Sequence, residues 1–128
     1  MKLGILKSVK ELDDLVESYR RACEKLNVDY VVIDLLADNW IDEIKDANVD
    51  GILVRTRGTI QEQKSMFDER LFVIQNYLKI PIYPSWKELF FYENKRMYAY
   101  YCEANGLPHP KTHVFYRRSD ALEYIKNA

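Results

Sequence analysis

Residues 30–54, with the sequence YVVIDLLADNWIDEIKDANVDGILV, decide the fold of this chain. The run Tyr30–Ile33 is β-branched and aromatic throughout, which is typical of a strand buried on both faces of a sheet. Asp38 is a candidate N-cap for a helix that continues to Ala47, and Gly51–Val54 predicts a second buried strand. A helix of this length between two strands indicates a right-handed βαβ crossover, and hence parallel pairing.

The same alternation of strand and helix runs through residues 1–84. Leu3–Leu6 predicts a strand at the start, and Ile82–Tyr83 predicts a short strand at the end. Two more amphipathic helices lie between them, with apolar residues at three- and four-residue spacing: Leu12, Leu15, Val16, Tyr19, Cys23 and Leu26 in one, and Phe67, Leu71, Ile74 and Leu78 in the other. The sequence therefore predicts an α/β domain over residues 1–84, with a doubly wound, mostly parallel four-stranded sheet of the Rossmann or flavodoxin-like type.

Residues 85–128 are predicted to form a helical hairpin followed by one strand and one helix. A capping box of the form Ser85-x-x-Glu88 opens the first helix. The next helix is predicted to begin near Asn94 and to end at Asn105-Gly106, and its buried face carries Met97, Tyr98, Tyr101 and Cys102. A strand over Thr112–Tyr116 follows. The last predicted helix has Leu122 and Ile125 turned inward.

The composition is that of an ordinary soluble globular protein. The 128 residues are 48% hydrophobic and 30% charged, with a net charge of −1. Because charges of both signs are interspersed, no attraction to nucleic acid or to an anionic membrane is expected. Cys23 and Cys102 lie on predicted apolar helix faces and are expected to be buried free thiols. With no signal peptide and no apolar run of membrane length, the expected location is cytoplasmic.

Ligands bind open parallel sheets beyond the carboxyl ends of the strands, so the residues that follow each predicted strand are candidates. The turn after the first strand, Lys7-Ser8, lacks the glycines of a dinucleotide-binding loop. Asp34 follows the second strand, where such folds often bind ribose. Without those glycines, a solvated or helix-capping aspartate is the favoured interpretation.

The strongest candidate site consists of Arg55, Thr56, Arg57 and Gly58. Two guanidinium groups and a glycine follow a buried strand and precede a helix N-terminus, where backbone N–H groups and the helix dipole also attract an anion. The alternative is two surface arginines with buried aliphatic stems. Both interpretations stay open from the sequence.

Other chemistry-bearing residues favour structural roles. Cys102, His109 and His113 straddle a helix end, a proline-rich turn and a predicted strand, so no metal site is predicted. Neither histidine has a recognisable Ser, Cys or Asp triad partner, so no catalytic residue is assigned. Seven tyrosines between Tyr83 and Tyr124 are interleaved with basic residues, which would suit base stacking on a nucleic acid. Their helical spacing favours a core or an interface instead.

Four short motifs stand in the last third of the chain: PSW at 84–86, YENK at 92–95, GLPHPKT at 106–112 and SDALEYI at 119–125. In this order they resemble the opening segment of ATP-grasp ligases, such as the glutathione synthetase-like and D-alanine–D-alanine ligase-like enzymes. Residues 1–81 resemble the pre-ATP-grasp domain by pattern alone. Asn94 and Lys95 match the (N/D)K pair of the family, which implies a position at the border of the nucleotide cleft. From the residues alone, Asn94 is a helix N-cap and Lys95 a solvated first-turn residue.

The resemblance implies an N-terminal fragment of an ATP-dependent carboxylate–amine or carboxylate–thiol ligase. Such enzymes activate a carboxylate with ATP as an acyl phosphate, which an amine or thiol then attacks. Their ATP-clamping lysines and metal-binding carboxylates come later, so ATP and Mg²⁺ are expected for a full-length enzyme and no cofactor for these residues alone. The substrate carboxylate or phosphate is expected at Arg55, and the isolated chain is expected to be inactive.

The alternative is a stand-alone flavodoxin-like binding or interaction module without enzymatic activity. An active receiver domain is excluded, because Lys7-Ser8 stands where its acidic pair would be and Arg55 replaces its phosphoacceptor. In either case, the apolar residues of the last two helices predict that residues 85–128 either fold back on the sheet domain or pair with a second copy, and a homodimer through residues 85–128 is the favoured outcome. No nucleic acid or membrane partner is expected.

Overall fold

The computed structural model describes residues 1–7, 14–55, 61–92 and 94–128. Residue contacts divide the chain into two compact units, Met1–Glu93 and Asn94–Ala128. The predicted domain boundary between residues 84 and 85 lies one short helix earlier. Each unit is described by itself.

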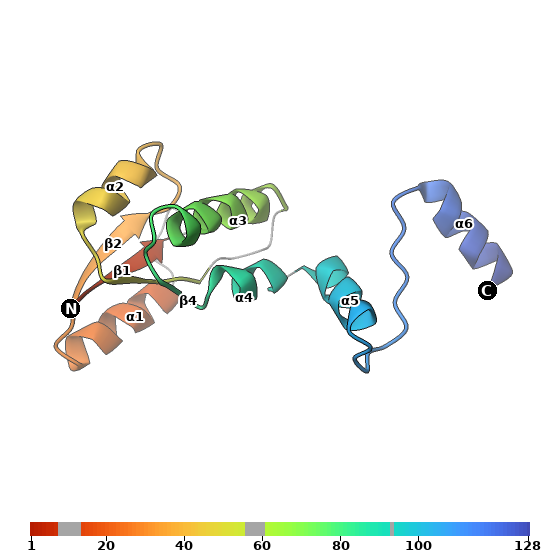
Figure 1. The fold of residues 1–128 in the computed structure, drawn as a ribbon, viewed down its shortest axis with the longest axis horizontal. Coiled ribbons are helices and arrows are strands. Elements are labelled where there is room, and N and C mark those ends of the chain that lie inside the picture. The colour runs from red at the N-terminus through yellow and green to blue at the C-terminus, as the bar shows by residue number, and fades with distance from the viewer. Residues whose placement is uncertain (8–13, 56–60, 93) are drawn as a thin grey trace. The chain divides into compact units, whose positions relative to one another are not determined.

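Four parallel strands form the sheet of the first unit (Figure 1). They are β1 (Lys2–Lys7), β2 (Asp29–Asp34), β3 (Gly51–Leu53) and β4 (Ile82–Tyr83), in the spatial order β2-β1-β3-β4. The predicted doubly wound parallel sheet is confirmed, and the strand order is that of flavodoxin-like folds. The chain crosses back over the sheet between β2 and β3, so the carboxyl ends of β1 and β3 lie side by side.

Helices cover both faces of this sheet (Figure 1). Helix α1 (Asp14–Lys25) packs on one face, where Val16 and Cys23 form a buried cluster with Ile5 of β1. Helices α2 (Trp40–Ala47) and α3 (Gln61–Asn76) pack on the other face. The larger core lies there and contains Leu6, Ile33, Leu35, Trp40, Ile44, Ala47, Ile52, Val54, Phe67, Leu71, Ile74, Ile82 and Leu89. Ile5 and Leu6 join different clusters because successive strand residues point to opposite faces.

The first βαβ unit departs from expectation at two places. Among the described strands, β2 pairs only with β1, so Tyr30, Val31 and Val32 are half-buried and only Ile33 of the predicted run is fully buried. Helix α2 begins at Trp40 with Asn39 as its N-cap residue, and the expected N-cap Asp38 is exposed. A turn delays the helix: Leu36 N–H donates to the Asp34 carboxylate (2.9 Å), and Ala37 N–H donates to the Asp34 carbonyl (3.2 Å).

Helix α4 (Trp86–Phe91) belongs to the first unit. The predicted capping box is confirmed: the Ser85 hydroxyl accepts from Glu88 N–H (3.4 Å), and the Glu88 carboxylate accepts from Ser85 N–H (2.7 Å). The Trp86 indole donates to the Asp68 carbonyl (2.9 Å), and Trp86 N–H donates to the Gln75 side chain (2.8 Å). These bonds fasten α4 to α3.

The second unit contains α5 (Lys95–Ala104) and α6 (Arg118–Asn127). Gly106, at φ 63°, ends the α5 turn as predicted, because glycine adopts the left-handed conformation at little cost. The predicted strand Thr112–Tyr116 is wrong: the segment belongs to no strand of the described chain. A strand needs a neighbour to receive its backbone hydrogen bonds, and no described segment pairs with this one.

The predicted inward faces of these two helices are also largely wrong. Cys102 is buried and Met97 is half-buried, but Tyr98 and Tyr101 are exposed. Leu122 is 46% exposed and Ile125 is 69% exposed, so α6 buries none of its residues. The expectation that both cysteines are buried free thiols is confirmed. No helix in the described residues is both long enough and apolar enough to span a membrane.

Candidate functional site

A cavity of about 250 Å³ lies at the carboxyl ends of β3 and β4. Its lining comes from four places in the sequence: Tyr19 of α1, Val54 and Arg55 after β3, Pro84 after β4, and Leu89 and Tyr92 at α4 and its end. This edge of a parallel sheet is where the fold places ligands. Arg55, one of the predicted site residues, is among these lining residues.

The local sequence explains why Arg55 reaches the rim of this cavity. Val54 is buried in the core, and its backbone N–H donates to the carbonyl of Tyr83 (2.9 Å), which ties the end of β3 to the end of β4. Arg55 is the next residue and is exposed. Of the predicted cluster, the structure describes Arg55, whereas Thr56, Arg57 and Gly58 lie outside the described residues.

The lining combines one cation with neutral and apolar groups. Arg55 is the charged member of the described lining, and neither aspartate nor glutamate is among them. Burial raises the pKa of the half-buried Tyr19, the positive charge of Arg55 acts in the opposite direction, and Tyr83 adds to the rise. The Tyr19 phenol therefore stays protonated at neutral pH and is available as a hydrogen-bond donor.

These side chains provide binding chemistry. A guanidinium donates two parallel hydrogen bonds to a carboxylate or a phosphate, and a tyrosine hydroxyl adds a third donor. Val54, Pro84 and Leu89 form apolar walls against which the rest of a small molecule can pack. The lining thus suits an organic anion.

Of the lining residues, Arg55 was predicted as a site residue, whereas Tyr19, Val54, Pro84, Leu89 and Tyr92 were not. Tyr19 was assigned to the apolar face of its helix. A usable signal existed for Tyr19: it lies in the first turns of a helix that follows a strand, and such turns flank the carboxyl edge of a sheet. Leu89 and Tyr92 carried no such signal, because their position depends on how α4 packs on α3.

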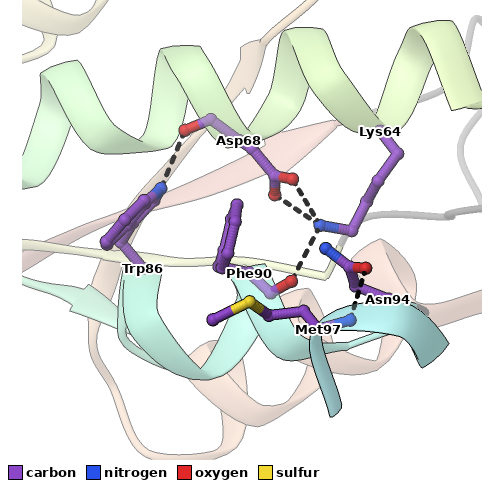
Figure 2. Close-up of polar contacts among 6 residues, drawn as sticks. All are labelled: Lys64, Asp68, Trp86, Phe90, Asn94 and Met97. Atoms are coloured by element: carbon purple, nitrogen blue, oxygen red, sulfur yellow. Dashed lines mark hydrogen bonds and ion pairs between the residues drawn. The ribbon is translucent and has the colours of Figure 1, made fainter. Parts of the chain in front are cut away.

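On α3, the buried Lys64 forms an ion pair with the half-buried Asp68 (Figure 2). Lys64 is 4% exposed, and its Nζ lies 2.5 and 2.6 Å from the two carboxylate oxygens of Asp68. The same Nζ lies 3.5 Å from the carbonyl oxygen of Phe90 and 5.6 Å from the centroid of the Phe90 ring. Burial raises the pKa of Asp68, although Lys64 opposes the rise. The pair holds Phe90, and with it the adjacent Leu89 of the cavity wall.

Asp34 has a structural partner on each side. One carboxylate oxygen accepts from Leu36 N–H (2.9 Å), and the other lies 3.9 Å from Nζ of Lys7. The aspartate therefore shapes the turn after β2 instead of capping a helix. Arg70 supports the same turn by donating to the carbonyls of Leu35 and Ala37.

In the second unit, Asn94 acts as the N-cap of α5. Its side-chain oxygen accepts from Met97 N–H (3.2 Å), as Figure 2 shows, and Lys95 is the exposed first residue of the helix. A smaller cavity of about 140 Å³ is lined by Asn94, Arg96, Met97, Tyr100 and Tyr116. The guanidinium of Arg96 lies 5.9 Å from the centroid of the Tyr116 ring. The role of Asn94 and Lys95 at a nucleotide cleft stays a prediction.

The histidines have separate surroundings. His109 lies 3.5 Å from the Glu103 carboxylate and 2.9 Å from the carbonyl oxygen of Leu107, through different ring nitrogens. His113 packs on the rings of Tyr124 and Phe115, with centroid distances of 4.4 and 6.2 Å. Across the described ranges, no three His, Cys, Asp or Glu residues are grouped so that they could hold a metal ion.

Comparison of the chain with models of protein families, with curated proteins and with solved structures finds no match.

Proposed function

We propose that this chain is the substrate-binding, N-terminal part of an ATP-dependent carboxylate ligase of the ATP-grasp type, and that the cavity beside Arg55 binds the acidic group of the substrate. The cavity at the carboxyl ends of β3 and β4 is the observation that carries this proposal. It stands at the ligand-binding edge of the sheet and has a guanidinium among its lining residues.

The local structure of the motif residues supports the ligase part of the proposal. The Ser85 capping box, the Asn94 cap and the Gly106 turn all take the helix-start and helix-end roles that their motifs require. The strand expected at Thr112–Tyr116, directly after the GLPHPKT motif, is not formed in the described chain, so this support comes from the three helix ends alone.

ATP and Mg²⁺ have no complete site in the described residues. Mg²⁺ prefers carboxylate oxygens, and the described chain offers no group of three acidic or imidazole ligands. The part assigned to these residues is therefore to bind and orient the substrate carboxylate. Activation of that carboxylate by ATP would need groups that lie elsewhere.

A binding experiment tests the assignment. The ¹⁵N-labelled chain is titrated with acetate, succinate, benzoate and phosphate, and amide shifts are followed around residues 51–55 and 82–92. Saturable shifts are expected for at least one anion, and Arg55→Gln is expected to lower its affinity about tenfold, which is the scale of a lost charge-assisted pair.

Arg21→Gln is the matched control, because it removes the same charge from an exposed position on α1 that does not line the cavity. If the two variants bind equally well, or if no anion shifts the carboxyl-edge amides, the proposed function is refuted.

A further inference from the structure

We propose that residues 94–128 bind single-stranded nucleic acid, with bases stacking on the exposed rings of His113, Phe115 and Tyr124 and with phosphates contacting the lysines and arginines around them. This inference goes beyond the proposed ligase function and does not depend on the Arg55 cavity. Every residue that carries it belongs to the second unit, and residues 94–128 are described throughout.

Three rings from two segments meet in this unit and form what we call the ring cluster. His113 and Phe115 lie in the segment before α6, which runs beside that helix, and Tyr124 lies on α6 (Figure 1). The centroid of the Tyr124 ring is 4.4 Å from that of His113 and 5.4 Å from that of Phe115. All three residues are exposed, Phe115 by 40% and Tyr124 by 41%. Rings that already hold one another in place lose little conformational freedom when a ligand stacks on them.

The two units of the chain carry opposite net charges. Residues 94–128 contain six lysines and arginines and three acidic residues, which gives a net charge of +3. Residues 1–93 contain 13 lysines and arginines and 17 acidic residues, which gives −4. The overall charge of −1 therefore conceals a basic unit, and such an asymmetry within a chain indicates an anionic partner such as nucleic acid or a membrane surface.

The positive charges lie around the ring cluster. All six basic residues of the second unit are exposed: Lys95, Arg96, Lys111, Arg117, Arg118 and Lys126. Nε of Arg117 lies 2.9 Å from the Asp120 carboxylate, so this pair is already formed. Within the described residues, none of the ion pairs includes Lys111, Arg118 or Lys126. These three residues stand two or three positions from a ring of the cluster and are the ones we assign to phosphates.

Exposure of the tyrosines removes the reason for giving them a purely structural role. Their helical spacing predicted a buried face, but Tyr98 is 59% exposed and Tyr116 is 77% exposed. The guanidinium of Arg96 lies 5.9 Å from the centroid of the Tyr116 ring. Aromatic rings together with arginine side chains are the groups on which proteins stack the bases of a single strand.

The combination of rings and charges decides between kinds of partner. A quaternary ammonium ligand would use the rings, but the lysines and arginines around them would repel it. A membrane surface attracts cationic amphipathic helices, whereas α6 carries Asp120 and Glu123 against Arg118 and Lys126 and is neutral. A single strand uses both features, because each base offers a flat face and each linkage a phosphate. In a duplex the bases stack on one another, so a single strand is the favoured form.

Fluorescence anisotropy of the 128-residue chain with a labelled oligo-dT of about 12 nucleotides tests this inference, since single-strand sites span about 4–16 nucleotides. If about three phosphates are neutralised, the logarithm of the affinity should fall with the logarithm of the salt concentration with a slope of about −2. Raising the salt from about 50 to about 200 mM should therefore weaken binding roughly 20-fold. A duplex of the same length should bind more weakly than the single strand.

Two sets of variants test the named residues. Tyr124→Ala removes a stacking ring and should weaken binding roughly tenfold, whereas Tyr124→Phe keeps the ring and should bind within about twofold of the wild type. Tyr77→Ala, at a 71% exposed tyrosine of the first unit, is the control and should leave binding unchanged.

The double variant Lys111→Gln/Arg118→Gln should make the salt slope shallower by about 1.4, the value for two phosphate contacts. Lys45→Gln/Lys87→Gln removes the same charge from exposed positions of the first unit and is its control. The amide spectrum shows whether each variant is folded. If Tyr124→Ala is not folded, the two charge variants still decide the outcome, because all four of these positions are exposed.

Three results would overturn the inference. One is an affinity for the strand that Tyr124→Ala and Lys111→Gln/Arg118→Gln leave unchanged, or no binding at low salt. Another is binding to phosphatidylserine vesicles without binding to the strand, which would assign the basic unit to a membrane. The third is displacement of the strand by an equal concentration of AMP, which would indicate a site for one nucleotide only. None of these results bears on anion binding at Arg55.

Discussion

Removing the charge of Asp68 should destabilise the first unit strongly. Lys64 is 4% exposed, and its Nζ contacts both carboxylate oxygens of Asp68. Breaking a buried pair by removing one partner costs about 3–5 kcal/mol, because the other charge remains buried without compensation. We expect a loss of about 3 kcal/mol for Asp68→Asn, at the lower end because the amide oxygen still accepts a hydrogen bond from Lys64.

The pair itself should add little net stability. Burial raises the pKa of Asp68 in spite of Lys64, which means that desolvation of the carboxylate outweighs the attraction of the ammonium group. The double variant Lys64→Met/Asp68→Leu is therefore expected to be about as stable as the wild type, within roughly 1 kcal/mol, since well-packed apolar residues often replace a buried ion pair without loss.

Urea unfolding followed by tryptophan fluorescence measures both effects. Trp40 and Trp86 are the two tryptophans, and both lie in the first unit, so the signal reports this unit. With a slope of roughly 1–3 kcal/mol per molar urea, a loss of this size lowers the midpoint by about 1–3 M. Glu69→Gln, at an exposed neighbouring position on α3, is the control and should stay within about 0.5 kcal/mol. If Asp68→Asn costs no more than Glu69→Gln, the reasoning is refuted.

Three further predictions concern pH, catalysis and assembly. Hydrogen bonds from Ser85 lower the pKa of Glu88 from its usual 4.5, so the contribution of Glu88 to stability is present above pH 4.5 and is lost as the pH falls through the lowered pKa. In the Glu88→Gln variant, the urea midpoint should therefore decline less steeply over this acid range. An unchanged decline would contradict the capping role. The isolated chain should not hydrolyse ATP in a phosphate-release assay, and a turnover abolished by one substitution within residues 1–128 would show otherwise. The exposed Leu122 and Ile125 should promote a homodimer through residues 85–128, which light scattering should show converting to monomer on Leu122→Ser/Ile125→Ser; a wild-type chain that stays monomeric at high concentration would exclude this assembly.

Much of the first unit was predictable because its signals are local. The spacing of Phe67, Leu71 and Ile74 identifies the buried face of α3, and Ser85 with Glu88 identifies the start of α4. Such patterns depend on residues within one or two turns of each other, so they predict the element correctly without knowledge of the tertiary packing.

The failures arose where structure depends on distant segments. The edge position of β2 follows from the strand order, which no single segment encodes. Thr112–Tyr116 has the composition of a strand, but no described segment pairs with it. Composition alone therefore predicted a strand that does not form. The same dependence on distant segments explains why Leu89 and Tyr92 were missed. Arg55 was found from its place after a strand, whereas Leu89 and Tyr92 reach the cavity only through the packing of α4 on α3.

The central claim is that Arg55 holds the carboxylate of a small substrate at the carboxyl edge of the sheet. A crystal structure of the chain grown with benzoate tests it most directly. The expected result is a carboxylate about 2.7–2.9 Å from the Arg55 guanidinium nitrogens, with the ring between Val54, Leu89 and the two cavity tyrosines. An Arg55 side chain engaged in an ion pair away from the strand ends, with benzoate bound elsewhere or not at all, would contradict the account.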